Sequence, residues 1–201
     1  MANQNWLSEI TLEGEVVSLQ PLRESHADAM VNAAADGKLW ELWFTSVPNA
    51  DTVASYISFA LSEKAAGRAM PFVVVLKETG QIIGSTRYCN AEPASKRVEI
   101  GYTWYARSYQ KSAVNTECKR LLLTHAFEEL DAMAVEFRTH WHNHPSRAAI
   151  ARLGAKQDGV LRNHRRDADG CYRDTVVFSI INQEWPTVKK GLQFKLNRHK
   201  S

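Results

Sequence analysis

Three strand-like segments lead directly into one strongly amphipathic helix, and this order constrains the fold more than any other feature. The segments follow one another across short polar turns, at residues 72–76, 81–88 and 98–105. Residues 115–130 then carry apolar side chains at helical spacing, which indicates a helix with one buried face. Because strands joined by short turns pair antiparallel, we expect an antiparallel meander that packs against this helix.

The remaining elements mix helices and strands without strict alternation. Further strands are expected at residues 15–19, 135–139, 159–162 and 172–181, and further helices at residues 25–37, 51–67 and 145–153. No internal repeat or linker-like stretch divides the chain. The sequence therefore predicts a single α+β domain over residues 1–201, with a mixed, mostly antiparallel central sheet flanked by helices and a core over about residues 15–186.

Composition limits the class of protein. Of the 201 residues, 44% are apolar and 23% are charged, which is enough apolar material for the core of one domain. The apolar runs are far shorter than the roughly 20 residues that span a bilayer, and the polar start of the chain has no export pattern. The cysteines lie too far apart for a disulfide framework or a metal-binding pair, at Cys89, Cys118 and Cys171. We expect a cytoplasmic protein with no membrane partner.

The location of the net charge matters more than its size. The formal net charge is +3, and residues 189–201 contain five basic groups and no acid, so subtracting five leaves −2 for the rest of the chain. A nucleic-acid-binding domain would carry a basic patch on its fold. We therefore expect residues 187–201 to form a solvated basic C-terminal tail, and we expect no nucleic acid as a partner.

Residues 99–116 form a strand, a loop and the start of the central helix. The free N–H groups in the first turn of a helix and the helix dipole favour an anion at such a junction. Lys111, Ser112 and Thr116 would add further donors there. Because many loop–helix junctions bind nothing, the geometry alone leaves an anion site and an ordinary connection as alternatives.

Several spaced motifs occur in the order that one family shows. They are the strand motif E-I-G-Y at Glu99–Tyr102, a loop at Gln110–Asn115, N-x-x-S at Asn143–Ser146 followed by Leu153–Ala155, and the terminal motifs at Gly159–Arg162 and Asp174–Ser179. With these motifs the chain resembles the GNAT acetyltransferase superfamily, and within it the RimJ/RimL type that acetylates the N-terminal amines of ribosomal proteins. The resemblance spans about residues 15–186 and implies the GNAT-like fold.

The resemblance implies acetyl-CoA as co-substrate and no metal. It assigns cofactor binding to the end of the strand, the loop and the two helix starts, at Thr103, Trp104, Tyr105, Gln110, Lys111, Ser112, Ala113, Val114, Asn115, Thr116 and Asn143. Ala113 and Asn115 stand where the family loop usually has small residues, mostly glycine. Alanine still lets the backbone approach a phosphate, and asparagine tolerates left-handed geometry, so we expect cofactor binding to survive.

The expected chemistry is direct attack of an amine on a thioester. The amine must first lose a proton, for which Glu99 is the candidate base; a structural carboxylate bonded to Arg87 or Arg97 is the equal alternative. The tyrosine that many GNAT enzymes use as acid is absent, and Ile150 stands in its place. The resemblance to the RimL type puts Ser146 forward to hydrogen-bond the departing thiolate.

The acceptor site is expected beside the first two helices. Trp40 and Trp43 stand where the family builds the acceptor wall, although core packing is the commoner use of such aromatics. Arg87 and Tyr88 complete the expected substrate-binding set. We expect a primary amine as acceptor, in the first place a protein N-terminus. The alternatives are a small-molecule amine or toxin, and a non-catalytic acyl-CoA-binding module. Exposed sheet edges or the C-terminal segment could also pair two copies into a homodimer.

Each of two side-chain clusters has a structural and a functional interpretation. His140, His142 and His144 alternate along a strand as a metal site would need, but Pro145 cuts the strand short and no carboxylate or cysteine lies nearby in sequence, so we expect no metal. The basic cluster at residues 162–166 is by default solvated, although Arg162 and His164 could contact an acidic or polar acceptor.

Overall fold

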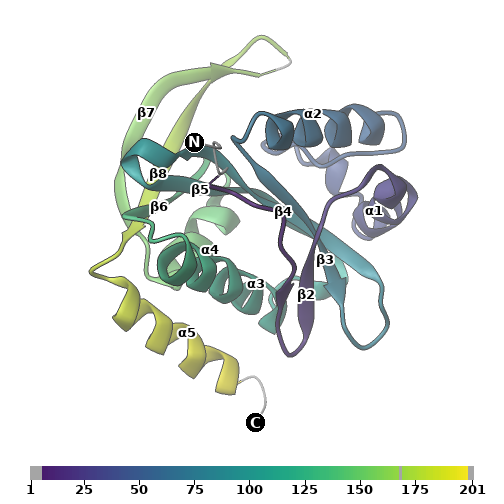
Figure 1. The fold of residues 1–201 in the computed structure, drawn as a ribbon. Helices are drawn as coiled ribbons and strands as arrows, with labels where there is room; N and C mark the ends of the chain where they lie inside the picture. Colours follow the sequence, from purple (N-terminus) through teal and green to yellow (C-terminus); the bar gives the residue numbers. More distant parts are fainter. Residues whose placement is uncertain (1–5, 168, 199–201) are drawn as a thin grey trace.

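An eight-stranded sheet forms the centre of the structure, a computed structural model that describes residues 6–167 and 169–198 (Figure 1). The strands lie in the order β1-β2-β3-β4-β5-β6-β8-β7, and every neighbouring pair is antiparallel except β5 and β6. Their bounds are β1 (Leu12–Glu13), β2 (Val17–Pro21), β3 (Met70–Leu76), β4 (Ile82–Glu92), β5 (Arg97–Tyr105), β6 (Ala134–His140), β7 (Lys156–Arg166) and β8 (Tyr172–Ile181). The predicted α+β class with a mostly antiparallel sheet is confirmed.

Helices cover both faces of this sheet. Helices α1 (Ala27–Ala35) and α2 (Val53–Ala65) lie on one face, and α3 (Ala113–Thr124), α4 (His144–Leu153) and α5 (Trp185–Arg198) lie on the other (Figure 1). Strand β3 shows why two cores arise, because its side chains alternate between the faces. Val73 and Val75 belong to the core under α1 and α2, whereas Phe72 and Val74 belong to the core under α3. None of the helices in the described part of the chain is long and apolar enough to cross a membrane.

The parallel pair β5–β6 is short and then opens. The two strands pair only at Arg97–Glu99 with Ala134–Glu136. Further along β5, Ser85 of β4 lies opposite Trp104 and Arg87 opposite Gly101, so β5 carries one extra residue between these pairs. Tyr102 takes the left-handed φ of 50° at this bulge. A bulge bends its strand and increases the local twist, which is consistent with β5 and β6 having no further paired residues after Glu99 and Glu136.

The C-terminal segment differs from the expected basic tail. Residues 185–198 form α5, in which Trp185, Val188, Leu192 and Leu196 recur at helical spacing and are buried, and the helix packs on α3. The basic side chains occupy its remaining faces, which is why the charge pattern alone predicted a solvated tail. Residues 199–201 of that segment lie outside the described residues.

Two further boundaries differ from expectation. The predicted helix 115–130 is α3 followed by a π-helical segment, His125–Glu129, in which the Leu130 N–H donates to the His125 carbonyl at 3.0 Å. Strand β7 begins earlier and ends later than the expected 159–162, because its ladder with β8 continues through two register shifts. The two-residue β1 was not predicted, since two residues carry no period.

A buried carboxylate ties α3 to the start of the sheet. Glu117 is 2% exposed and accepts hydrogen bonds from the backbone N–H groups of residues 15, 16 and 17, at 2.8–2.9 Å. A Cβ on Gly14 would lie 2.6 Å from the Glu117 carboxyl carbon, so only glycine allows this close approach. This contact fixes the helix that carries the candidate anion site against β2.

Glu117→Ala should therefore lower the free energy of unfolding by about 3 kcal/mol, because it removes the acceptor of three backbone N–H groups, of which that of Val17 is buried and the other two are partly buried. The measurement is the urea midpoint with its slope. The control is Glu129→Ala, which removes an exposed carboxylate from the π-helical segment that follows α3. Equal shifts in both variants would contradict this structural role.

Candidate active site

The opening between β5 and β6 places two helix starts at one edge of the sheet. Parallel strands run in one direction, so the segments that follow them emerge on the same side. The chain after β5 leads into α3 at Ala113, and the chain after β6 leads into α4 at His144. Each helix presents first-turn N–H groups and the positive end of its dipole. The arrangement suits a long ligand with an anionic part that enters between two separated strands.

The loop before α3 is held by its own side chains. Ser112 is the N-cap of α3: its hydroxyl donates to the Tyr109 carbonyl at 2.6 Å, and its oxygen accepts from the Val114 N–H at 3.3 Å. The Gln110 amide donates to the Tyr105 carbonyl at 2.9 Å. Ser112 and Gln110 therefore shape the loop rather than offer free donors.

The left-handed residue of this loop is Lys111, with φ 59°, so the tolerance of Asn115 for left-handed geometry is not used. Asn115 and Ala113 are helical, partly exposed members of the first turn of α3. Val114 and Thr116 are buried beneath them, so the Thr116 hydroxyl does not face an incoming anion as predicted. The exposed Lys111 and the backbone of the first turn remain as the groups that can bind phosphate.

The end of β5 sends its side chains to both faces. Trp104 lies in the core under α1 and α2, and Tyr105 lies in the core under α3, so neither ring lies free in the opening. Between the bulge and these rings, the Thr103 hydroxyl lies 2.7 Å from the Thr86 hydroxyl and accepts a hydrogen bond of 2.7 Å from Lys119 Nζ. Hydrogen-bonded polar side chains thus lie in a row beneath the splayed part of β5.

Lys119 is a buried amine on α3. It is 5% exposed, and its Nζ lies 6.0 Å from the centroid of the Phe137 ring on β6. Burial lowers its pKa from 10.5 to about 8. The side chain therefore lies between the two strands that separate, where its charge is poorly solvated.

Glu99 is the last residue of β5 that pairs with β6. It is 8% exposed; the Asn90 amide donates to its Oε2 at 2.7 Å, and Arg138 Nε lies 3.6 Å from the same oxygen. Burial raises the pKa of this carboxyl, against the opposing effects of Asn90 and Arg138. A Cβ on Gly101 would lie 3.0 Å from Oε1, so glycine at 101 makes room for the carboxylate.

The expected partners of Glu99 lie elsewhere. Arg97 hydrogen-bonds Glu136. Arg87 is 1% exposed, with its guanidinium carbon 3.9 Å from the ring centroid of Tyr102 and 4.8 Å from that of Tyr56. Its three guanidinium nitrogens have no hydrogen-bond partner in the described part of the chain. The alternative in which Glu99 is bonded to either of these two arginines is therefore wrong.

Tyr88, expected to bind substrate, lies on the other face. It is fully buried, packs against Phe72, and donates its hydroxyl proton to the Leu122 carbonyl of α3. Neighbouring strand residues point to opposite faces, so Arg87 and Tyr88 cannot both line one pocket. The structure makes Tyr88 a core residue.

The start of α4 brings Asn143 and Ser146 together. Asn143 is the N-cap, and its side-chain oxygen accepts from the Ser146 N–H at 3.1 Å. Ser146 is partly exposed, and Ile150, one turn further, is buried in the core. The amide oxygen of Asn143 is therefore committed to capping, while the Ser146 side chain is accessible near the end of β6.

The loop that follows α1 reaches the same edge. Trp40 packs on the core under α1 and α2, whereas Trp43 is 67% exposed and its ring lies 5.1 Å from that of His140, at the end of β6. Trp43 also lines an open cavity of about 250 Å³ together with residues 44–46 and the β7–β8 hairpin. Trp40 therefore packs as a core residue, and Trp43 lies where an acceptor wall was predicted.

The alternating histidines gather around Trp43 rather than around a metal-ligand set. His140 and His142 have ring centroids 5.6 Å apart, and a carboxylate distant in sequence, Asp167, lies 3.6 Å from His140 Nε2. Within residues 6–167 and 169–198, no group of three or more His, Cys, Asp or Glu side chains is arranged to hold a metal ion.

Comparison with known proteins decides the family. The sequence profile described as "Acetyltransferase (GNAT) domain" matches residues 17–156. The chain belongs to the GNAT acetyltransferase family. It is an N-acetyltransferase of the RimJ/RimL type, as the motifs predicted.

Three relatives show how similar the chain is to known proteins. YdaF of Bacillus subtilis, provisionally named a ribosomal N-acetyltransferase, is 31% identical over 106 residues, which are 53% of this chain and 57% of that protein. A GCN5-related N-acetyltransferase from Brucella melitensis is 27% identical with a TM-score of 0.83, over 94% of this chain and 86% of that one. RimJ of Mycobacterium smegmatis, in complex with CoA-disulfide, is 26% identical with a TM-score of 0.76, over 92% and 93% of the two chains.

Several residues of this GNAT site were not found from the sequence. Asn90 and Arg138 contact Glu99 from other strands, and Lys119 reaches Thr103 from α3. Such contacts depend on register and on the direction of single side chains, which periodicity does not provide. The one available signal was a lysine on the otherwise apolar face of the predicted central helix.

The buried Lys119 predicts a pH-dependent stability. The folded chain releases this proton near pH 8, whereas the unfolded chain holds it to about pH 10.5. Between these values the unfolded state binds more protons, so the wild-type free energy of unfolding should rise with pH relative to Lys119→Met. Below pH 8 the methionine variant should be the more stable. Parallel curves from pH 6 to 11 in urea titrations would contradict a buried, weakly basic amine.

Proposed function

We propose that this GNAT enzyme transfers the acetyl group of acetyl-CoA directly to the amino group of a protein N-terminus. The observation that supports it is the opening between the parallel strands β5 and β6, with a helix start at each strand end and a buried carboxylate where the strands part. CoA is bound by the RimJ relative. The accessible Lys111 and the first turn of α3 suit its phosphates.

In this proposal the strand ends orient the thioester. The splayed β5 has backbone groups that β6 does not pair, and an N–H among them donates to the thioester carbonyl oxygen as negative charge develops there. The hydrogen bonds from Lys119 to Thr103 and between Thr103 and Thr86 fix this part of the strand from below. Direct attack needs no covalent enzyme intermediate, and Cys118 is unsuited to form one, because it is fully buried and burial raises its thiol pKa to about 12.

Glu99 acts as the base, directly or through one water. The acceptor ammonium gives one proton to the carboxylate, its nitrogen forms a bond to the acetyl carbon, and the carbon–sulfur bond breaks. The nitrogen loses its second proton as the amide forms, and that proton goes to the CoA thiolate, which leaves as the thiol. A base is more effective when its pKa lies nearer to the working pH, and burial shifts Glu99 in that direction. Ser146, in the first turn of α4, donates a hydrogen bond to the leaving thiolate.

An open acceptor site favours a protein N-terminus over a small amine. The cavity beside Trp43 lies between a surface loop and the β7–β8 hairpin, and Trp43 itself is mostly exposed. An extended peptide end can enter such a site, whereas a small amine is usually enclosed. The relative YdaF is provisionally named a ribosomal N-acetyltransferase.

The test is release of CoA thiol with acetyl-CoA and a panel of peptides, polyamines and aminoglycoside-like amines. Peptides with a free N-terminus should react and their N-acetylated forms should not. Turnover confined to small amines would overturn the protein acceptor.

Glu99→Gln should lower kcat/KM for a reactive peptide about 10²–10⁴-fold near neutral pH. The deficit should shrink as the pH approaches the pKa of the amine, where solvent removes the proton unaided. Asn90→Ala serves as the comparison, because it removes the hydrogen bond to Glu99 Oε2 but retains the carboxylate itself. A constant deficit from pH 6 to 10 would eliminate Glu99 as the base.

A further inference from the structure

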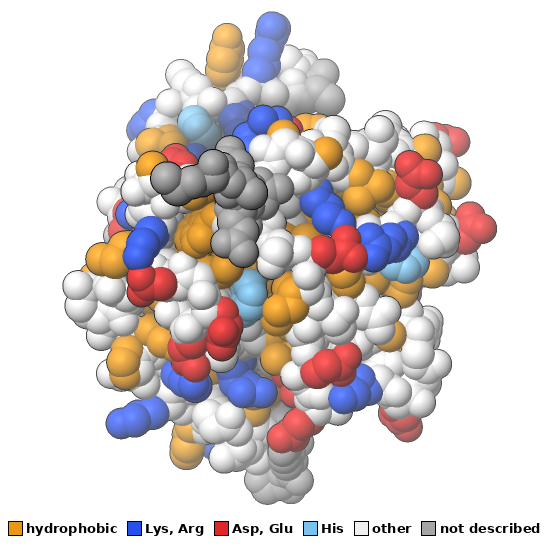
Figure 2. Space-filling view, viewed as in Figure 1, with side chains coloured by type: hydrophobic (Ala, Val, Ile, Leu, Met, Phe, Trp, Pro, Cys, Tyr) orange, Lys and Arg blue, Asp and Glu red, His pale blue; other side chains and the backbone are white. Residues whose placement is uncertain are grey.

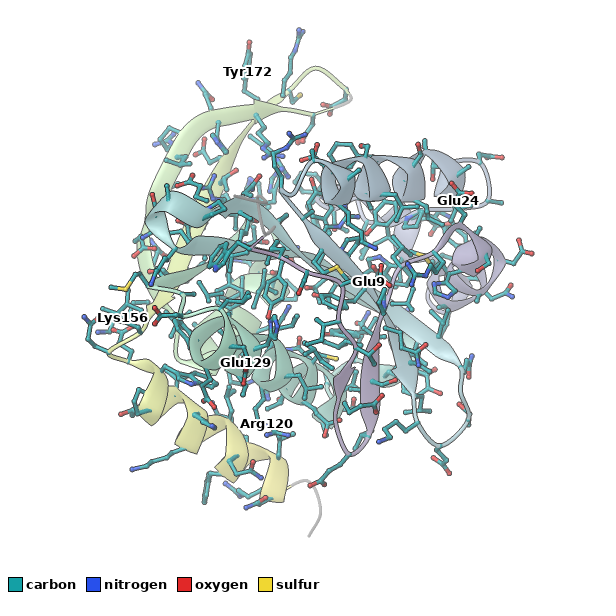
Figure 3. All side chains as sticks on the ribbon, in the orientation of Figure 1. Glu9, Glu24, Arg120, Glu129, Lys156 and Tyr172 are labelled. Carbon is teal, nitrogen blue, oxygen red and sulfur yellow. The ribbon has the colours of Figure 1, made fainter. Side chains whose placement is uncertain are left out.

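Three arginines line the cavity between the loop at residues 43–46 and the β7–β8 hairpin. Arg165 and Arg166 come from β7 and Arg173 from β8, and Asp167 is the one acidic residue among the lining side chains. We call this cavity the arginine pocket. Lysine and arginine side chains gather over this end of the molecule in Figure 2, and Figure 3 shows Tyr172 pointing away from the tip of the same hairpin.

The charge of these arginines is only partly compensated. Asp167 Oδ1 lies 3.4 Å from Arg173 Nε, but Asp167 Oδ2 also faces His140 at 3.6 Å. Arg166 Nε donates to the uncharged Gly170 carbonyl at 3.0 Å. The Arg165 guanidinium has no hydrogen bond or ion pair within the described ranges. Among the described lining residues, Asp167 therefore pairs with Arg173 alone, and Arg165 and Arg166 have no carboxylate partner.

The register of the hairpin makes this arrangement unfavourable by itself. Arg165 lies directly opposite Arg173 on the antiparallel strands. Like charges in such cross-strand positions destabilise a sheet. An anion placed between the two guanidinium groups would relieve their repulsion. Burial, and after it the charges of Arg165 and Arg173, lowers the pKa of His164. Burial and then Arg173 lower the pKa of His140, against the opposing effect of Asp167.

The pocket adjoins the reacting end of the site. Trp43, which lines it, contacts the His140 ring at the end of β6. Arg165 also interacts electrostatically with Glu99 and Tyr102 of β5. An anion in the pocket would therefore lie beside the end of β6, next to the arginine whose charge acts on Glu99.

We propose that the arginine pocket binds a carboxylate of the acceptor next to its reacting amine, so that the enzyme selects acidic acceptors. The inference rests on the proposed function and specifies its substrate class. The carboxylate can be an acidic side chain near a peptide N-terminus or the carboxylate of a free amino acid, and both present the same amine–carboxylate chemistry to the arginines.

The test compares peptides that differ only in the second residue, Glu, Gln or Lys, together with free glutamate and glutamine. The Glu peptide should exceed the Gln peptide about tenfold in kcat/KM, through a lower KM, as expected for hydrogen bonds to a charged group. The Lys peptide should be the poorest. The preference should decline with added salt, which screens exposed charges.

Arg165→Gln and Arg173→Gln should each remove most of this preference, because kcat/KM should fall further for the Glu peptide than for the Gln peptide. The matched control is Arg162→Gln, on the same strand, where the arginine is 81% exposed, pairs with Asp174 and does not line the pocket. The control should keep the preference. Loss of preference in the control as well would overturn the assignment to this pocket.

The outcomes separate the two proposals. Peptides acetylated without regard to charge would overturn the acidic acceptor and leave N-terminal acetylation standing. Turnover of free glutamate but of no peptide would support the carboxylate site and overturn the protein acceptor. If no acceptor turns over, calorimetry with CoA and the N-acetylated Glu and Gln peptides decides, and equal affinities would overturn the inference.

Discussion

The parting of β5 and β6 is the constraint on which the rest of the site depends. Three residue pairs hold the strands together, and after Glu99 and Glu136 they share no ladder. The bulge at Tyr102 redirects β5 while β4 still follows it. Because β5 and β6 are the one parallel pair of the described sheet, the chain segments after both emerge at the opening and begin α3 and α4 there. A uniformly antiparallel sheet would place these helix starts at opposite edges.

Ionisable side chains occupy this opening at a cost in stability. Glu99 and Lys119 are buried on opposite faces of β5, and burial disfavours the charged form of each. Arg87 is covered by two tyrosine rings without a hydrogen-bond acceptor in the described chain, and the β7–β8 hairpin sets two arginines opposite each other. Unfavourable electrostatics of this kind concentrate at functional sites. Glu117 and the two cores supply stabilisation elsewhere, away from the opening.

The sequence predicted the element order well and the side-chain contacts poorly. Strands 72–76, 81–88 and 98–105 and the central helix have clear periods, and spaced motifs identified the family. Helix α5 was missed because its basic side chains masked the spacing of Trp185, Val188, Leu192 and Leu196. Tyr88 was predicted beside Arg87 in the acceptor set, but a strand sends neighbouring side chains to opposite faces, and Tyr88 lies in the core. The partners of Glu99 come from β4 and β6, and their approach depends on register.

The most direct measurement is a crystal structure of the complex with acetyl-CoA. The account predicts phosphates at Lys111 and the first turn of α3, the pantetheine arm between residues 100–105 of β5 and residues 137–140 of β6, and the acetyl group on the side of Glu99. The thiol end should lie near Ser146. A pantetheine arm that runs outside the β5–β6 opening, or an acetyl group that lies in the cavity beside Trp43, would contradict the account.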